Sequence, residues 1–181
     1  MPGPVIPLIK LFVEIALFRR GPDAVPAGSQ VLWLTIGLYV ALTLVLQFLL
    51  PSRIPNLMLQ LPVGVAFTLG WYGLLLYLAN RPERFLQTAT AVFGLQLVLR
   101  PLLAPVDWLW PQLAKDSPLV IVVAGFALLL LGWSLAVNAR IVRAALECTP
   151  VAAAGLVLAE FLTSQVLFLA MIGPPPEAAV P

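Results

Sequence analysis

The stretch VLWLTIGLYVALTLVLQFLL, residues 31–50, has twenty residues and no charged side chain. A helix needs about 20 apolar residues to cross a bilayer, so this stretch predicts a transmembrane helix. Four more stretches share its length and its apolar character, with few polar interruptions. The five predicted spans cover residues 31–50, 57–79, 85–104, 119–137 and 148–172.

The composition of the whole chain predicts the same class of protein. Of its 181 residues, 61% are hydrophobic and only 10% are charged, against about a quarter in an ordinary soluble domain. A soluble fold leaves too little polar surface to cover so many apolar residues. We therefore expect an all-α fold, a polytopic membrane helix bundle. A soluble globular enzyme, a disordered tail and a disulfide scaffold are excluded.

The segment before the first span, residues 1–30, contains an apolar run that is too short to cross. From Leu8 to Phe18 it measures about 16 Å as a helix, against about 30 Å for the hydrocarbon core of a bilayer. Lys10 and Glu14 lie one helical turn apart and form a narrow polar stripe. These features predict an amphipathic interfacial helix that lies on the membrane or packs under the bundle. A docking helix for a partner is the alternative.

The connections between the spans are short, so residues 31–172 are expected to form one transmembrane domain. Residues 1–30 would supply the interfacial helix and a cytoplasmic connector. Residues 173–181 would form a short Pro-rich tail on the outside.

The orientation follows from the basic residues, which are enriched on the cytoplasmic side of membrane proteins. With the N-terminus in the cytoplasm, seven of the ten Lys and Arg residues fall on that side. They are Lys10, Arg19, Arg20, Arg81, Arg84, Arg140 and Arg143. The other three, Arg53, Arg100 and Lys115, fall outside. We therefore predict a cytoplasmic N-terminus and an outside C-terminus. The richness in Ala, Leu, Arg and Pro favours a bacterial inner membrane.

Glu160 is the most informative residue, because it lies near the middle of the last predicted span. A carboxylate at the bilayer centre costs roughly 2.5–3.5 kcal/mol, so it should face the bundle and have a partner. Arg100 is the candidate, since the two lie at depths of roughly 22 and 18 Å from one side at about 1.5 Å per residue. The pair could be a proton or substrate site or a structural ion pair. In a third interpretation, Arg100 reaches outward to the headgroups.

Several kinds of chemistry have no residues to support them. The chain has no His and one Cys, Cys148, and its net charge is +2 with scattered basic residues. There is no P-loop, paired Cys, HExxH motif or nucleophile elbow in the sequence. We therefore expect no cofactor, no metal, no nucleic-acid partner and no enzymatic activity.

The five-span layout with a cytoplasmic N-terminus resembles the Yip family of small membrane proteins. The sequence GWSL, with Gly132, Trp133, Ser134 and Leu135, is similar to the short Gly-Tyr motif of that family. The acidic Asp-Leu-x-Gly-Pro element that precedes the first span in that family is not present, and only Gly21-Pro22 is similar to part of it, with Asp23 after rather than before. Uncharacterised bacterial inner-membrane proteins of this layout are similar as well.

This resemblance implies a scaffold or adaptor. Eukaryotic Yip proteins bind Rab GTPases in membrane trafficking, a role that would not carry over to a bacterium. The implied function is to bind partners or organise membrane, the partners being the lipid bilayer and other membrane proteins or further copies of the chain. The alternative is a small transporter or channel subunit whose path is lined by Glu160, Arg100 and Gln96. The two interpretations differ in where Glu160 points: a dry helix contact favours the scaffold, and a wet cavity favours the transporter.

Overall fold

The computed structural model describes residues 5–50, 56–114 and 116–172 of the chain. These residues form six α-helices and three short 3-10 helices, with no strand among them. The α-helices are α1 (Val5–Ala16), α2 (Ser29–Leu49), α3 (Leu57–Leu78), α4 (Phe85–Leu109), α5 (Leu119–Leu146) and α6 (Pro150–Ile172). The 3-10 helices are η1 (Pro22–Ala24), η2 (Pro82–Arg84) and η3 (Trp110–Gln112).

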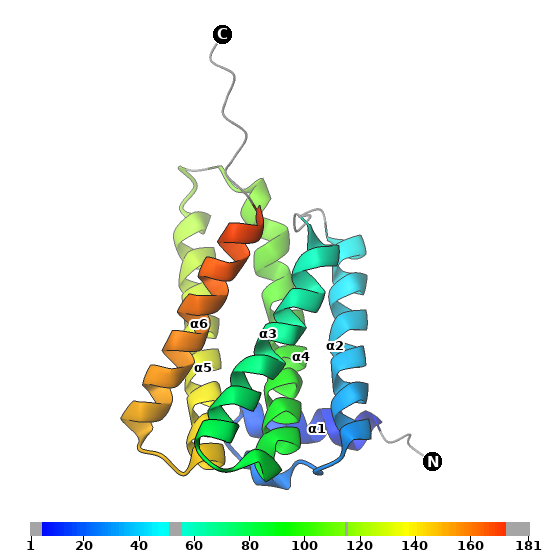
Figure 1. The fold of residues 1–181 in the computed structure, drawn as a ribbon. Helices are drawn as coiled ribbons and strands as arrows, with labels where there is room; N and C mark the ends of the chain where they lie inside the picture. Colours follow the sequence, from blue (N-terminus) through cyan, green and yellow to red (C-terminus); the bar gives the residue numbers. More distant parts are fainter. Residues whose placement is uncertain (1–4, 51–55, 115, 173–181) are drawn as a thin grey trace.

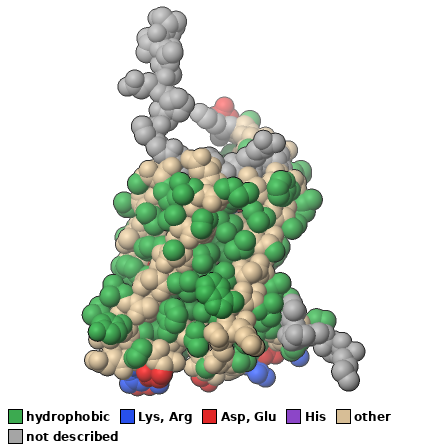
Figure 2. Space-filling model, turned by 45° about the vertical axis from the view of Figure 1, so that its right-hand side comes forward, with side chains coloured by type: hydrophobic (Ala, Val, Ile, Leu, Met, Phe, Trp, Pro, Cys, Tyr) green, Lys and Arg blue, Asp and Glu red, His purple; other side chains and the backbone are tan. Residues whose placement is uncertain are grey.

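Five of these helices, α2 to α6, are long and apolar enough to cross a membrane. They run alongside one another as a bundle, and α1 lies across one end of it (Figure 1). Apolar side chains cover the visible flank of the bundle, and charged side chains gather at the end where α1 lies (Figure 2). The prediction of an all-α bundle of five spans is therefore confirmed, and the chain is an integral membrane protein.

Two helices are longer than the apolar stretches that predicted them. α4 continues past residue 104 to Leu109, although it contains Pro101 and Pro105. α5 continues past residue 137 through Arg140 to Leu146. A helix can continue beyond its apolar stretch into charged residues, because its backbone hydrogen bonds are satisfied within the helix.

α4 is the central element and packs against α1, α2, α3 and α5. Its residues from Thr88 to Leu95 are all buried. Small side chains in this run let neighbouring helices approach closely. The hydroxyls of Thr88 and Thr90 donate to the carbonyls of Arg84 and Leu86 one turn earlier, so they are satisfied without a partner from another helix.

α1 packs under the bundle, which is one of the two placements that its sequence predicts (Figure 1). Phe12 is 1% exposed and lies directly over Gly94 of α4, where a Cβ atom would come within 2.2 Å of its ring. The indole of Trp133 in α5 donates a hydrogen bond to Ala16 O at 3.0 Å. The missing side chain at Gly94 therefore leaves the notch in which Phe12 seats α1.

The basic residues that the sequence assigns to one side do lie near one end, which we call the α1 end. The α3–α4 and α5–α6 connections lie there as well (Figure 1). Arg100 is in the half of α4 that leads away from this end. The predicted Pro-rich tail, Arg53 and Lys115 lie outside the described residues.

Candidate functional site

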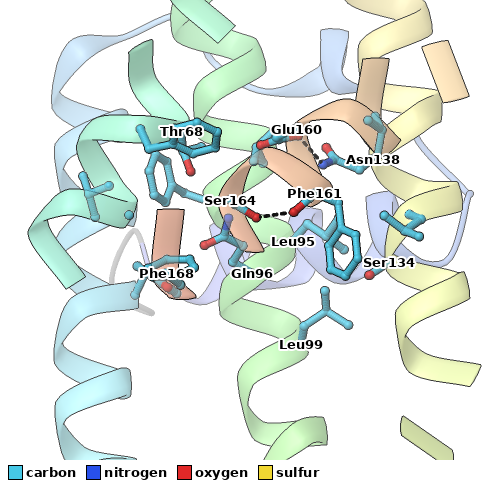
Figure 3. Close-up of a pocket in the computed structure, with 18 residues that line it drawn as sticks. Thr68, Leu95, Gln96, Leu99, Ser134, Asn138, Glu160, Phe161, Ser164 and Phe168 are labelled. Carbon is cyan, nitrogen blue, oxygen red and sulfur yellow. Dashed lines mark hydrogen bonds between the residues drawn. The ribbon is translucent and has the colours of Figure 1, made fainter. Parts of the chain in front are cut away.

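A cavity of about 230 Å³ lies inside the bundle, between α3, α4, α5 and α6, with Tyr39 contributed by α2. Apolar and aromatic side chains form most of its wall, and Figure 3 shows the polar groups among them. The polar lining residues are Thr68, Gln96, Ser134, Asn138, Glu160 and Ser164. Polar side chains at this depth are rare in membrane proteins and mark functional paths or helix contacts.

Regular helical spacing brings three pairs of polar side chains to this region. Residues four apart lie on the same face of a helix. α3 carries Thr68 and Tyr72, α5 carries Ser134 and Asn138, and α6 carries Glu160 and Ser164. Three helices that each turn such a pair toward a common centre produce a polar interior in a bundle whose outside is apolar.

Glu160 is 8% exposed, and its two hydrogen-bond partners are neutral. Tyr72 Oη donates to Glu160 Oε2, and Asn138 Nδ2 donates to the same oxygen at 3.3 Å. No described residue donates to Oε1. Packing does not seal that oxygen, since the buried polar side-chain atoms without a partner in the described part of the chain are Thr43 Oγ1 and Trp71 Nε1. Glu160 therefore presents one unpaired carboxylate oxygen to the cavity.

The Tyr72 hydroxyl has one proton to donate and lies between two possible acceptors, Glu160 and Asn138. Its hydroxyl oxygen lies within hydrogen-bond distance of Glu160 Oε2 and, at 3.1 Å, of Asn138 Oδ1. A phenol donates one hydrogen bond and accepts others. With Glu160 ionised, Tyr72 donates to the carboxylate. With Glu160 protonated, the carboxyl group donates to Tyr72, which then donates to Asn138, so the same three side chains fit both states.

Gln96 of α4 lines the same cavity, in agreement with its choice as a candidate site residue. Its amide lies near Ser164 and Phe168 in the close-up (Figure 3). Among the residues that the structure describes, the Gln96 side chain makes no hydrogen bond. An amide without a protein partner in a cavity can donate to and accept from a ligand.

The structure gives Arg100 a different partner from the one predicted. Its guanidinium lies 3.9 Å from Asp107 of the same helix, and Glu160 bonds Tyr72 and Asn138. The predicted Glu160–Arg100 ion pair is therefore wrong. Counting residues gives the depth of a side chain but not its direction. Arg100 follows the cavity residue Leu99 and points about 100° away from it around the helix.

At the α1 end, ion pairs join the α3–α4 connection to the α5–α6 connection, and we call this group of ion pairs the latch. Arg81 and Arg84 each form an ion pair with Glu147, at 2.5 Å. These hydrogen bonds lower the pKa of the exposed Glu147 carboxyl group, Arg81 contributing most. Arg84 also donates to Ala144 O at 2.7 Å, so it satisfies a terminal carbonyl of α5.

Arg140 and Arg143 lie one turn apart near the end of α5. The guanidinium of Arg140 donates to Phe18 O and lies 5.6 Å from the centre of the Phe18 ring. It therefore holds the chain that follows α1. Arg143 lies in the last helical turn, where a positive charge interacts favourably with the helix dipole.

The GWSL motif divides between two places in the structure. Trp133 anchors α1 through its indole nitrogen. Ser134 and Leu135 line the cavity. Gly132 faces open space, since a Cβ atom there would meet nothing within 4 Å. The motif thus connects the seat of α1 to the cavity wall along one turn of α5.

Tyr72 is the site residue that the sequence interpretation missed. A tyrosine in an apolar span is ordinarily read as a core residue, and only its spacing of four from Thr68 marks it. Within the described ranges no group of three His, Cys, Asp or Glu side chains could hold a metal ion.

Comparisons with family models, with curated proteins and with solved structures find no match for this chain.

Proposed function

We propose that this protein is a small transporter subunit that binds its solute in the intramembrane cavity. Glu160 is the group that exchanges a proton for the solute. The observation that carries the proposal is the unpaired Oε1 of Glu160 in a cavity of about 230 Å³. A carboxylate oxygen that faces a cavity supports a transporter over a scaffold, for which a dry helix contact was expected.

The charge balance around Glu160 supports exchange. An isolated carboxylate in a medium of low dielectric is strongly disfavoured unless a proton or a cation neutralises it. The groups that face it are Tyr72 from α3 and Asn138 from α5, which are both neutral, and Gln96 is the polar residue that α4 contributes to the cavity. No described cation lies within ion-pair distance of Glu160. A proton or a bound cation therefore completes the site.

α3 is the wall best suited to move. It packs against α4 and α6 but makes few contacts with α2, which precedes it in the chain. Pro62 lies inside this helix and removes a backbone hydrogen bond. Gly64 of α3 lies beside the ring of Phe168 of α6, since a Cβ atom at Gly64 would come within 3.3 Å of that ring. Displacement of α3 from α6 would open the cavity.

The positive-inside rule places the α1 end in the cytoplasm, and we propose this orientation in an inner membrane. The seven basic residues assigned to that side support it. A Yip-like adaptor role stays a prediction, as does the absence of enzymatic activity.

Access to the cavity from both membrane faces tests the proposal. In a Cys148→Ala background, a Ser164→Cys variant places a thiol in the cavity wall, and a Leu128→Cys variant places one on the lipid side of α5, where Leu128 is 67% exposed. A membrane-impermeant methanethiosulfonate is added to right-side-out or inside-out vesicles. A transporter predicts labelling of Ser164→Cys from both sides.

The Leu128→Cys control should stay unlabelled from either side, because lipid excludes a charged reagent. Failure to label Ser164→Cys from either face would overturn the proposal. Labelling from one face only would show a binding site without alternating access, which also contradicts a transporter.

A further inference from the structure

The cavity lining contains one acidic side chain and no basic one. Glu160 is its only ionisable lining residue apart from Tyr39. No described Lys or Arg lines the cavity, and Arg100, Arg81 and Arg84 pair with other carboxylates, Asp107 and Glu147. An anion would therefore meet an unpaired carboxylate, whereas a cation would neutralise it. The electrostatics of the lining select a positively charged occupant.

Aromatic side chains form part of the rest of the lining, together with aliphatic ones. Five lining residues are aromatic, and they come from four helices: Tyr39 of α2, Phe67 of α3, Phe93 of α4, and Phe161 and Phe168 of α6. Tyr39 and Phe93 are 5.8 Å apart between ring centres and inclined at 52°. Aromatic faces carry negative charge density and bind substituted ammonium ions in cages of this kind. Rings from several helices can contact one rounded cation on several sides.

The same lining disfavours a metal ion. Calcium takes six to eight oxygen ligands from carboxylates, carbonyls and waters, and magnesium takes six in near-ideal octahedral geometry, so both need a dense set of oxygen atoms. The cavity supplies one carboxylate, and no group of three acidic, His or Cys side chains occurs among the described residues. The volume of about 230 Å³ also exceeds the roughly 150 Å³ of a cavity that holds benzene. The space therefore fits a compact organic ion.

We infer that the occupant is a small organic monocation, a substituted ammonium of about the size of choline. Its positive centre lies between the Glu160 carboxylate and the aromatic rings, and Gln96 and Ser164 are placed to hydrogen-bond a polar substituent. This inference rests on the proposed function and names its substrate class. The ammonium is that of a free compound, because lipid headgroups stay at the bilayer surface.

Isothermal titration calorimetry on the full chain tests the charge requirement. The protein is held in nanodiscs of phosphatidylglycerol, which carries no ammonium group. Choline chloride is compared with 3,3-dimethylbutan-1-ol, its neutral counterpart of the same shape. We expect saturable binding of choline and at least about tenfold weaker binding of the alcohol. Equal binding of the two would overturn the inference, since shape alone would then explain affinity.

Matched variants assign the binding to the cavity. Glu160→Gln should lose choline binding by at least about tenfold, and Glu160→Asp should retain part of it. Glu147→Gln is the control, because Glu147 lies at the α1 end and pairs with arginines. Phe161→Leu should weaken binding about 2- to 30-fold, the range expected for one cation–π contact. Phe126→Leu changes an exposed ring on α5 and should leave binding unchanged.

The outcomes separate the two proposals. If Ser164→Cys is labelled from both sides but choline does not bind, the cation class is wrong and the transporter proposal stands. If choline binds but Glu160→Gln binds it equally well, the inference is overturned too, because the carboxylate is then not the site. Should Glu160→Gln fail to fold, the Phe161→Leu and Glu160→Asp variants carry the same comparison.

Discussion

The seat of α1 and the α3–α6 cavity are built from the same kinds of residue but in opposite ways. At the seat, Phe12 fills the notch over Gly94, Trp133 has a hydrogen-bond acceptor and Glu147 has two arginines. At the cavity, a Cβ atom at Gly64 would meet only the tip of the Phe168 ring, and Glu160 has an oxygen with no partner among the described residues.

This difference indicates that the α1 end stabilises the fold, whereas the cavity is the candidate functional region. Groups at the α1 end satisfy one another, which is how a protein stabilises a fixed arrangement. Polar groups at the cavity keep hydrogen-bonding capacity that the described residues do not use. Trp71, beside the cavity residue Phe67 on α3, also has a buried indole nitrogen without a partner. Equivalent substitutions at the two places should therefore have unequal effects.

Glycine substitution should give the largest difference in stability. A Cβ atom at Gly94 would lie 2.2 Å from the Phe12 ring, whereas at Gly64 it would lie 3.3 Å from the tip of Phe168. We expect Gly94→Ala to lower the free energy of unfolding by about 1–3 kcal/mol, the usual cost of overpacking. Gly64→Ala should cost less, because the tip of a ring can shift. Thermal unfolding in detergent measures both.

Gly125→Ala is the control for this pair, since a Cβ atom there meets nothing within 4 Å. A second change, Phe12→Leu, should recover part of the loss in Gly94→Ala if the clash is its cause. Equal melting temperatures for Gly94→Ala and Gly125→Ala would show that α1 is not seated on α4.

Tryptophan substitution should give a smaller difference. Trp133→Phe removes the hydrogen bond to Ala16 O, and Trp71→Phe removes an N–H group that has no partner in the described structure. Both lose similar ring volume, so the difference between them isolates the hydrogen bond. Trp133→Phe should be less stable than Trp71→Phe by about 0.5–1.5 kcal/mol in the same melting assay. A less stable Trp71→Phe would contradict the contrast.

The smallest effect concerns Glu147 and appears only at low pH. Arg81 and Arg84 lower its pKa below the ordinary value of 4.5, so the folded protein favours the ionised form. The stabilisation is complete above that value and is lost as the pH falls through the lowered pKa. Glu147 is exposed, so solvent screens the pairs and keeps the effect small.

Melting curves from pH 6 to pH 3 measure this effect. The unmodified protein should lose stability over this range more steeply than Glu147→Gln. In a separate measurement at pH 7, the Glu160→Gln variant should retain the stability of the unmodified protein, because the change removes a carboxylate from the bilayer. A Glu147→Gln profile parallel to that of the unmodified protein would show that the latch does not stabilise the fold.

The number and order of the spans could be predicted, because a bilayer imposes the length and apolar character of each helix. The first span was predicted as residues 31–50, and α2 is Ser29–Leu49. The end of α5 could not be predicted from apolar character. That helix ends at Leu146, nine residues after the predicted end at 137. The next residue, Glu147, takes a left-handed conformation with φ of 52°.

The site was predicted in part. Glu160 and Gln96 do line the cavity, because a polar group in a span avoids lipid. Their partners could not be predicted, since rotation and tilt of the helices depend on packing between segments far apart in the chain. Tyr72 and Glu160 are 88 residues apart, and neither sequence neighbourhood contains information about the other.

The seat of α1 also sets an order of events during synthesis. Ala16 leaves the ribosome 117 residues before Trp133, which binds it. At about 5–20 residues per second this interval is roughly 6–25 s. Its main seat, Gly94 of α4, is made earlier than Trp133, so only until α4 is complete must α1 rest on the membrane, where its exposed apolar residues Ile6, Ile9 and Val13 can hold it. The first helix to be made therefore docks only after α4 is made, and its hydrogen bond to Trp133 has to wait for α5.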